Sequence, residues 1–388
     1  MSLIWNIMPL GASHGWGICG KYLTLALKHL TPLRFLTESL ASDIHDNPAH
    51  NRALAEVYEP LERIRSMQNA KGTYCLNAPV LQTVTGSNLK PWWISVQAPR
   101  LVGYTFFERT RLAPADITAA REYFDWIAAG SAWCEDILRN HGLERTSTVI
   151  QGIDPALFHP GYAEKKQYRD QFAIFSGGKL EFRKGQDLVL RAFKVMQDKY
   201  SDVILVNAWY NMWDESLLTM RFSPYIRFDM PKGDYFKAVN RLLEANQIDP
   251  ARVVTLGPKP HGQMAAFYAD TDIGLFPNRC EGGTNLVLME YMACAKPAVA
   301  SYGTGHRDIL TDRNSLPIRT LGRLDLRDPD GRLLEQYADP NLDEIVSRLE
   351  WAYLHRDELK PIGLQAGQAM QQWTWQKAAE AFLKLLQA

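Results

Sequence analysis

Residues 276–293 read FPNRCEGGTNLVLMEYMA, and the interpretation of the whole chain starts from this stretch. It opens on an apolar segment, continues through a turn with two glycines, and becomes an apolar run of helical length from Leu286. Gly283, Thr284 and Asn285 would then lie at a helix start, where free N–H groups and the helix dipole attract phosphate. The stretch predicts a strand, an anion-binding turn and a helix in succession.

Two glutamates frame this turn, because Glu281 precedes it and Glu290 lies inside the expected helix. A carboxylate is poorly suited to binding phosphate, but it accepts hydrogen bonds from vicinal hydroxyls such as those of ribose or a hexose. A glutamate buried in an apolar helix needs such a partner. We interpret Glu290 as a ligand for sugar hydroxyls. The alternative is a core glutamate that other protein groups satisfy.

A second loop, FSGGKLEFRKG at residues 175–185, follows another predicted strand. It carries Lys179 and Lys184, and Gly178 opens its backbone. Two fixed cations suit a diphosphate, whose negative charge grows when it departs as a leaving group. Taken alone, the loop is better explained as solvated charge. The helix start at residues 283–285 favours a diphosphate site.

A third glycine-containing loop lies near the beginning of the chain, where Gly15, Gly17 and Gly20 have the GxGxxG spacing. The glycines begin several residues beyond the expected strand end, and the nearest acidic residue after the next strand is Glu38. A dinucleotide site and a tight strand–helix turn are both open at this loop.

The order of elements predicts two α/β halves. In the first half the expected strands are Leu3–Leu10, Leu33–Leu36, Tyr74–Leu76, Leu101–Phe107, Trp126–Ala129 and Thr148–Gln151. In the second half they are Ala173–Ser176, Val203–Asn207, Val253–Leu256, Ile273–Phe276 and Ala298–Ser301. Helical stretches separate them, which favours parallel sheets covered on both faces. A Pro- and Gly-rich linker at residues 152–161 divides the alternation.

These patterns predict an α/β protein of two Rossmann-like domains that face each other across a cleft. The expected domains are residues 1–160 and 161–371. Residues 372–388 end in an Ala/Leu/Lys helix that can pack on either half, so their addition to the first domain is left open. A length of 388 residues is compatible with two to three domains.

The composition is that of an ordinary globular protein, with 46% hydrophobic and 22% charged residues. The 43 basic and 43 acidic residues cancel, so the charge pattern of a general nucleic-acid binder is missing. Five cysteines without a CxxC pair fit neither a disulfide framework nor a thiolate zinc site. Reduced, buried cysteines in a cytoplasmic protein are expected. Neither a signal peptide nor an apolar run of membrane-spanning length is recognisable.

The second half resembles the retaining glycosyltransferases of family four, which have the GT-B fold. That family carries a Gly-Arg-Leu…Lys-Gly loop, to which residues 178–185 are similar, with Lys179 in place of the arginine. It also carries a Glu-x7-Glu motif, and Glu281 and Glu290 resemble it with eight intervening residues instead of seven. Further similar stretches are residues 102–108, 130–133 and 152–160, so the resemblance covers most of the chain from Leu101 onward.

The resemblance implies a role for each matching residue. Lys179 and Lys184 would bind the donor diphosphate, with Gly178 in the same loop. Gly283, Thr284 and Asn285 would contact phosphate and sugar through backbone groups. Glu290 would hold the nucleotide ribose and Glu281 the transferred sugar, while Gly15 and Gly17 would approach the donor phosphate from the opposite domain.

One position departs from the family pattern. Many members have a His-Asp pair after the strand at residues 101–107, and this chain has Glu108 followed by Arg109 there. A polar role in the site and an ion pair with Arg109 or Arg111 are equally open for Glu108.

No metal or other cofactor is expected, because two cations are enough to stabilise a departing diphosphate. Two Asp-x-Asp sequences are candidate metal ligands. The one at residues 270–272 precedes a strand and so lies away from the cleft. The other, at residues 328–330, falls in a charged stretch that we expect to be free of strands and to form a turn.

We therefore expect a metal-independent retaining hexosyltransferase of polysaccharide biosynthesis. It would move a hexose-type sugar from a nucleotide-diphosphate sugar to a glycan, lipid-linked or small-molecule acceptor. A nucleotide-sugar epimerase or hydrolase of the same fold and a non-catalytic nucleotide-sugar-binding scaffold are the alternatives. No nucleic-acid partner is expected. Trp92-Trp93 leaves peripheral attachment to the inner face of the membrane open for this cytoplasmic protein.

Overall fold

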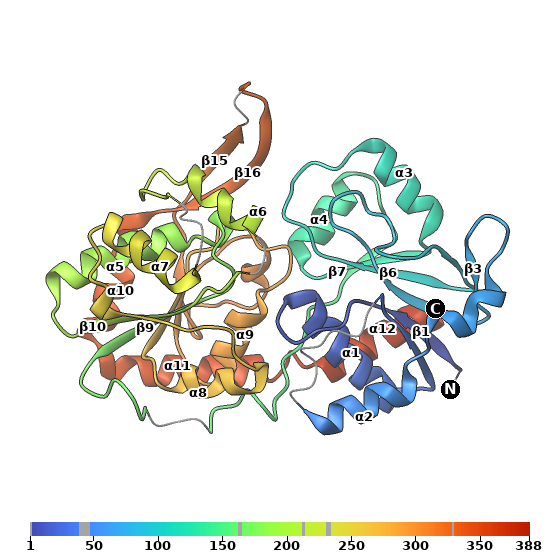
Figure 1. The fold of residues 1–388 in the computed structure, drawn as a ribbon, viewed down its shortest axis with the longest axis horizontal. Helices are drawn as coiled ribbons and strands as arrows, with labels where there is room; N and C mark the ends of the chain where they lie inside the picture. Colours follow the sequence, from blue (N-terminus) through green and yellow to red (C-terminus); the bar gives the residue numbers. More distant parts are fainter. Residues whose placement is uncertain (1, 39–46, 162–164, 212–213, 230–233, 328–329) are drawn as a thin grey trace.

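The computed structural model describes residues 2–38, 47–161, 165–211, 214–229, 234–327 and 330–388. The described chain forms two halves, each built on a six-stranded parallel sheet with helices on both faces (Figure 1). The predicted α/β architecture, two Rossmann-like halves of the GT-B type, is confirmed. The domain boundary expected at residues 160 and 161 falls between the last strand of the first sheet and the first strand of the second.

The first sheet has the order β2-β1-β4-β6-β7-β8. Its strands are β1 (Ile4–Ile7), β2 (Leu33–Leu36), β4 (Val80–Thr83), β6 (Leu101–Thr105), β7 (Trp126–Ala129) and β8 (Thr146–Thr148). Its helices are α1 (Gly15–Leu30), α2 (Pro48–Val57), α3 (Pro114–Tyr123) and α4 (Ala132–Asn140). The short strands β3 (Tyr74–Cys75) and β5 (Val96–Gln97) pair separately.

The second sheet has the order β11-β10-β9-β12-β13-β14. Its strands are β9 (Phe172–Gly177), β10 (Val203–Ala208), β11 (Val253–Thr255), β12 (Ile273–Phe276), β13 (Ala298–Ser301) and β14 (Leu316–Ile318). Its helices are α5 (Gln186–Lys199), α6 (Asp214–Leu217), α7 (Tyr235–Ala245), α8 (Met264–Ala269), α9 (Leu286–Ala293), α10 (Leu342–Leu354) and α11 (Arg356–Met370).

The C-terminal helix α12 (Trp375–Gln387) returns to the first half and packs beside α1 (Figure 1). Its crossing runs next to the linker, where the Ile153 amide donates to the Trp373 carbonyl oxygen at 2.9 Å. One apolar cluster is continuous across the halves, and it includes Leu23, Tyr291 and Phe382. Since apolar area removed from water is a main source of stability, this shared core holds the two halves together.

Three strands, the position of a fourth, and a hairpin differ from the sequence expectations. Strands β4, β5 and β14 were not predicted, and β8 begins two residues before the strand expected at Thr148. The stretch around residues 328–330, expected to be free of strands, is flanked by β15 (Leu321–Arg327) and β16 (Leu333–Pro340). These two strands pair antiparallel, so that expectation was wrong. Asp328 and Pro329 themselves lie outside the described residues.

Candidate active site

The candidate loops follow strands at the points where the strand order of each sheet reverses. In the first sheet β1 lies between β2 and β4, and the loop that leads to Gly15 follows β1. In the second sheet β9 and β12 are neighbours, and the loops at residues 178–185 and 277–285 follow them. Parallel α/β sheets bind ligands in the crevice at such switch points. The topology therefore brings the candidate loops of the second half together.

Lys184 and Glu281 meet at the centre of this arrangement. The Lys184 ammonium lies 2.6 Å from Glu281 Oε1, and the Arg183 guanidinium lies 3.5 Å from Glu281 Oε2. Lys184 and Arg183 belong to a short 3-10 helix, Phe182–Lys184, whereas Glu281 follows β12. The structure thus places one predicted cation directly on one predicted carboxylate, immediately before the start of α9.

Glu281 is held in an anionic state. Its burial alone would raise its pKa, but the positive charges of Lys184 and Arg183 outweigh burial and lower the pKa to about 2. The side-chain amide of Asn278 also donates to Glu281 Oε1. A fixed anion beside the helix start can accept hydrogen bonds from sugar hydroxyls.

Lys179 belongs to the same charged network, which consists of Lys179, Glu181, Arg183, Lys184 and Glu281, but it pairs with a different carboxylate. Its ammonium is 3.2 Å from Glu181 Oε2, and the Arg183 Nε atom is 3.2 Å from Glu181 Oε1. Arg183 therefore bridges Glu181, which pairs with Lys179, and Glu281, which pairs with Lys184. Gly178 precedes them with a φ of 101°, in the left-handed region that favours glycine.

The turn before α9 is buried against the first half. The Gly282 carbonyl oxygen accepts a hydrogen bond from the Ser131 hydroxyl at 2.7 Å, and a Cβ on Gly282 would come within 2.4 Å of the Phe107 carbonyl oxygen. A Cβ on Gly305 would meet the Gly283 carbonyl oxygen at 1.8 Å. Close packing against neighbouring backbone thus requires glycine at positions 282 and 305.

Thr284 and Asn285 are also enclosed, and Asn285 has a φ of 63° at the N-cap of α9. Its side-chain amide lies 3.3 Å from His306 Nε2, while His306 Nδ1 lies 3.2 Å from the Ser301 carbonyl oxygen. A carbonyl oxygen only accepts, so Nδ1 carries the proton and Nε2 accepts from Asn285. Burial lowers the pKa of His306 to about 4, which keeps this imidazole neutral.

The first loop combines close packing with an open position. The N-cap residue of α1, His14, accepts from the Gly17 amide through Nδ1 at 3.0 Å. A Cβ on Gly17 would lie 2.7 Å from the Gly11 backbone, which is the packing that a tight strand–helix turn predicts. A Cβ on Gly15, by contrast, would meet no heavy atom within 4 Å. Gly15 is the glycine of this loop with space beside it.

Glu290 is separated from the charged network and has protein partners. Its Oε1 lies 2.7 Å from His261 Nε2, and the Tyr268 hydroxyl donates to its Oε2 at 3.4 Å. His261 Nδ1 lies 3.3 Å from the hydroxyl oxygen of Tyr22, which comes from α1 in the other half. This is the arrangement that the core-glutamate alternative describes. A ribose at Glu290 would have to replace or share these contacts.

Glu108 reaches across to the second half. In the described part of the chain its ion-pair partner is Arg183, at 3.5 Å, rather than the neighbouring Arg109 or Arg111. Arg109 instead lies 3.9 Å from Glu335, and Arg111 donates to the Leu333 carbonyl oxygen at 3.2 Å. Of the two alternatives left open for Glu108, the described residues do not show the pairing with Arg109 or Arg111.

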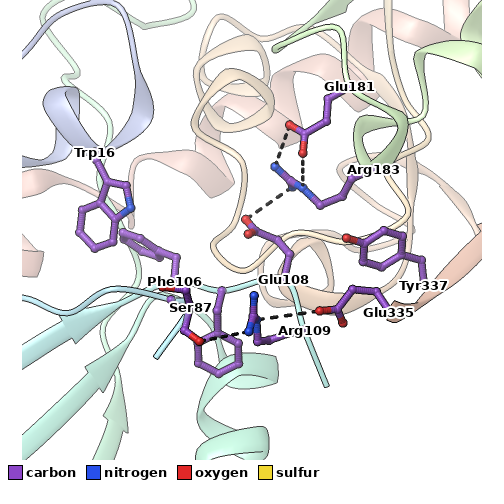
Figure 2. Close-up of a pocket in the computed structure, with 11 residues that line it drawn as sticks. Trp16, Ser87, Phe106, Glu108, Arg109, Glu181, Arg183, Glu335 and Tyr337 are labelled. Atoms are coloured by element: carbon purple, nitrogen blue, oxygen red, sulfur yellow. Dashed lines mark hydrogen bonds and ion pairs between the residues drawn. The ribbon is translucent and has the colours of Figure 1, made fainter. Parts of the chain in front are cut away.

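A cavity of about 410 Å³ lies between the halves beside this network (Figure 2). Its lining residues are Trp16, Gly86, Ser87, Phe106, Phe107, Glu108, Arg109, Glu181, Arg183, Glu335 and Tyr337. Lys179, Lys184 and residues 283–285 are not among them, so the cavity adjoins the predicted diphosphate site without containing it.

Arg183, Glu335 and Tyr337 were missed by the sequence reasoning. Arg183 stands in the quoted loop, but its role depends on carboxylates that lie 75 residues before it and 98 residues after it. Glu335 and Tyr337 belong to the unpredicted hairpin. The alternation of Leu324 and Leu326 with charged residues was the signal for a strand there.

The remaining expectations concern the cysteines, metal ligands and membrane-spanning helices. Four cysteines are buried, as expected, but Cys75 is exposed. Within the described residues no group of three or more His, Cys, Asp or Glu side chains is arranged to hold a metal ion. The helices of the described ranges include none with the length and apolar character needed to span a membrane.

A family model matches much of the second half. Residues 163–319 match the family model described as "Glycosyl transferases group 1". This match covers the loops that carry Lys179, Lys184, Glu281 and Glu290. No curated protein matches the chain in sequence.

Solved structures match the fold over the whole chain. Sucrose-phosphate synthase from Thermosynechococcus elongatus has a TM-score of 0.67 at 14% identity and covers 100% of this chain and 98% of its own. Anabaena HepE in complex with UDP and glucose has a TM-score of 0.63 at 14% identity, with 99% of both chains covered. A glycosyltransferase from Rickettsia africae has a TM-score of 0.62 at 12% identity, covering 99% and 97%. The chain therefore shares the GT-B fold of these structures.

Proposed function

We propose that the protein is a retaining glycosyltransferase that moves a hexose-type sugar from a nucleotide-diphosphate sugar to a carbohydrate, lipid-linked or small-molecule acceptor. The observation that carries the proposal is the contact between Lys184, Arg183 and Glu281 within the segment that matches group 1 glycosyl transferases. These charges lie at the switch point of the second sheet, where α/β proteins bind their ligands. The HepE structure in complex with UDP-glucose, which has the same fold, supports this type of donor.

The chemistry follows from the charges at the switch point. The bond between the anomeric carbon and the diphosphate oxygen breaks, and the acceptor oxygen forms a bond to the same face of the sugar. The acceptor proton moves to the departing phosphate oxygen. The Lys184 ammonium stabilises the negative charge on the leaving diphosphate, and the anionic Glu281 accepts hydrogen bonds from the transferred sugar. These residues need no metal for that role.

Donor entry requires movement of the two halves. The turn at residues 281–285 is buried, with Gly282 against the Phe107 backbone of the first half. A diphosphate at the start of α9 therefore needs these segments to separate first. Closure over the bound donor would then exclude water, which competes with the acceptor.

The proposal is tested by incubating the purified protein with UDP-, GDP-, ADP- and TDP-sugars and a panel of sugar, polyol and polyprenyl-phosphate acceptors. We expect acceptor-dependent release of one nucleoside diphosphate, an unchanged activity in EDTA, and a product with the donor's anomeric configuration by NMR. Release without any acceptor would indicate a hydrolase, and a changed sugar configuration on the nucleotide would indicate an epimerase. Donor binding without release or rearrangement would leave only the scaffold alternative.

A further inference from the structure

The hairpin of β15 and β16 is the part of the second half that reaches furthest from its sheet (Figure 1). It begins at Leu321, just after the segment that matches group 1 glycosyl transferases ends at residue 319. The hairpin is therefore a feature of this chain that the family match does not include.

Every second residue of β16 from Glu335 to Asp339 either anchors the hairpin or lines the cavity. Asp339 accepts from Arg279 Nε at 3.1 Å and from the Tyr225 hydroxyl at 2.9 Å, which fixes the base of the strand. Tyr337 and Glu335 follow at two-residue intervals and both line the cavity. Successive side chains of a strand alternate between its faces, so all three residues share one face. The anchor at Asp339 thus aims Tyr337 and Glu335 into the cleft.

The hairpin also contacts the first half. Arg109 is 3.9 Å from Glu335, and Arg111 donates to the Leu333 carbonyl oxygen. In Figure 2, Trp16 of the first half lies on one side of the cavity, and Glu335 and Tyr337 lie on the other. The hairpin therefore forms the wall opposite the start of α1.

The charges of the cavity are unsuited to an anion. Three carboxylates line it, from Glu108, Glu181 and Glu335, against the guanidinium groups of Arg183 and Arg109. Arg183 already faces Glu108, Glu181 and Glu281 within 3.5 Å. An incoming anion would therefore meet carboxylates and guanidinium groups that already have partners.

The position of Glu335 adds to this bias. Its side chain is 25% exposed, and burial together with the nearby Glu108 charge raises its pKa against the opposing effect of Arg109 and Arg111. A raised carboxyl pKa means that this place disfavours negative charge, so a second anion beside Glu335 would be repelled. Sugar hydroxyls, in contrast, donate to carboxylates, and aromatic rings such as those of Trp16 and Tyr337 provide apolar surface for a sugar ring.

We propose that the β15–β16 hairpin makes this cavity an acceptor subsite for an uncharged, hydroxyl-rich sugar unit, with Glu335 and Tyr337 as specificity-determining residues. The inference rests on the proposed function for its acceptor role. Glu335 accepts from acceptor hydroxyls and excludes carboxylate-bearing sugars, while Tyr337 packs against the sugar ring.

The test is a binding comparison that needs no donor. Saturation-transfer NMR measures the affinity of the protein for methyl glucoside, methyl galactoside and the corresponding methyl glucuronide and galacturonide. We expect each neutral glycoside to bind at least about tenfold more tightly than its acid. Glu335→Gln should narrow that ratio severalfold, and Tyr337→Ala should weaken binding of the neutral glycosides. Asp325→Asn, on β15 and outside the cavity lining, is the matched control and should leave the ratio unchanged.

Several results would overturn the inference: equal or tighter binding of the acids, no binding of any glycoside, or an unchanged ratio in Glu335→Gln. Tighter binding of methyl glucosaminide than of methyl glucoside would assign the cavity to cationic sugars instead. Donor cleavage is measured separately, by release of nucleoside diphosphate. Its absence would refute the glycosyltransferase proposal but would leave the outcome of the binding comparison standing.

Discussion

Replacement of Arg279 by methionine tests how the charged loop of the second half is held in place. The side chains of Arg279 and Asp187 are both fully buried, and two guanidinium–carboxylate contacts of 2.7 and 2.9 Å join them. Arg279 also donates to the Phe182 carbonyl oxygen at 2.8 Å and to Asp339. Removing one partner of a buried pair leaves an uncompensated charge and costs about 3–5 kcal/mol. We expect Arg279→Met to lower the free energy of unfolding by about that amount.

The assay is urea unfolding followed by tryptophan fluorescence. A double variant, Asp187→Leu with Arg279→Met, removes both charges of the fully buried pair and should recover much of the loss, because no fully buried carboxylate then lacks its partner. The partly exposed Asp339 keeps the Tyr225 hydroxyl as a donor. Arg319→Met is the matched control, since its pair with Asp312 is exposed and should contribute little. A loss for Arg279→Met no larger than that of the control, or a double variant no more stable than the single one, would refute the reasoning.

Two further predictions concern Glu290 and His306. Glu290→Gln should weaken donor binding severalfold in calorimetry if a ribose hydroxyl replaces His261 as its partner; an unchanged affinity would leave Glu290 as a core residue. The pKa of His306 is lowered from 6.5 to about 4, so the folded state disfavours its protonation and stability should fall as the pH drops through that window. The loss is on the order of 3 kcal/mol, and His306→Gln should reduce it in melting curves between pH 7.5 and 4.5. If the stability of the wild-type protein and of His306→Gln fell equally with pH, the loss would not come from His306.

The parts of the fold that the sequence predicted are those with strong local patterns. The run from residue 276 to 293 contains its own strand end, glycine turn and helix start, so β12 and α9 were predicted from neighbouring residues alone. Strand β4 was missed because it has only four residues, and two of these, Gln82 and Thr83, are polar although buried. The Gln82 amide is satisfied by the Ile94 carbonyl oxygen, a contact that no local pattern indicates.

The residues of the candidate site could be predicted from the sequence more readily than the contacts between them. Lys184 and Glu281 were each identified as candidates, but their contact joins residues 97 positions apart. Arg183 was overlooked because a charged residue in a loop is usually solvated, whereas here it is buried among three carboxylates. Such roles depend on which segments the topology brings together, and a single sequence does not specify that for individual side chains.

The central claim is that Lys184 binds the diphosphate of a nucleotide donor. Calorimetric titration of the wild-type protein with UDP, GDP, ADP and TDP, and with the matching monophosphates, tests it most directly. We predict that one diphosphate binds at least about tenfold more tightly than its monophosphate, and that Lys184→Ala removes this difference while far-ultraviolet circular dichroism stays native. Equal binding of diphosphate and monophosphate by the wild-type protein, or an unchanged preference in Lys184→Ala, would contradict the account.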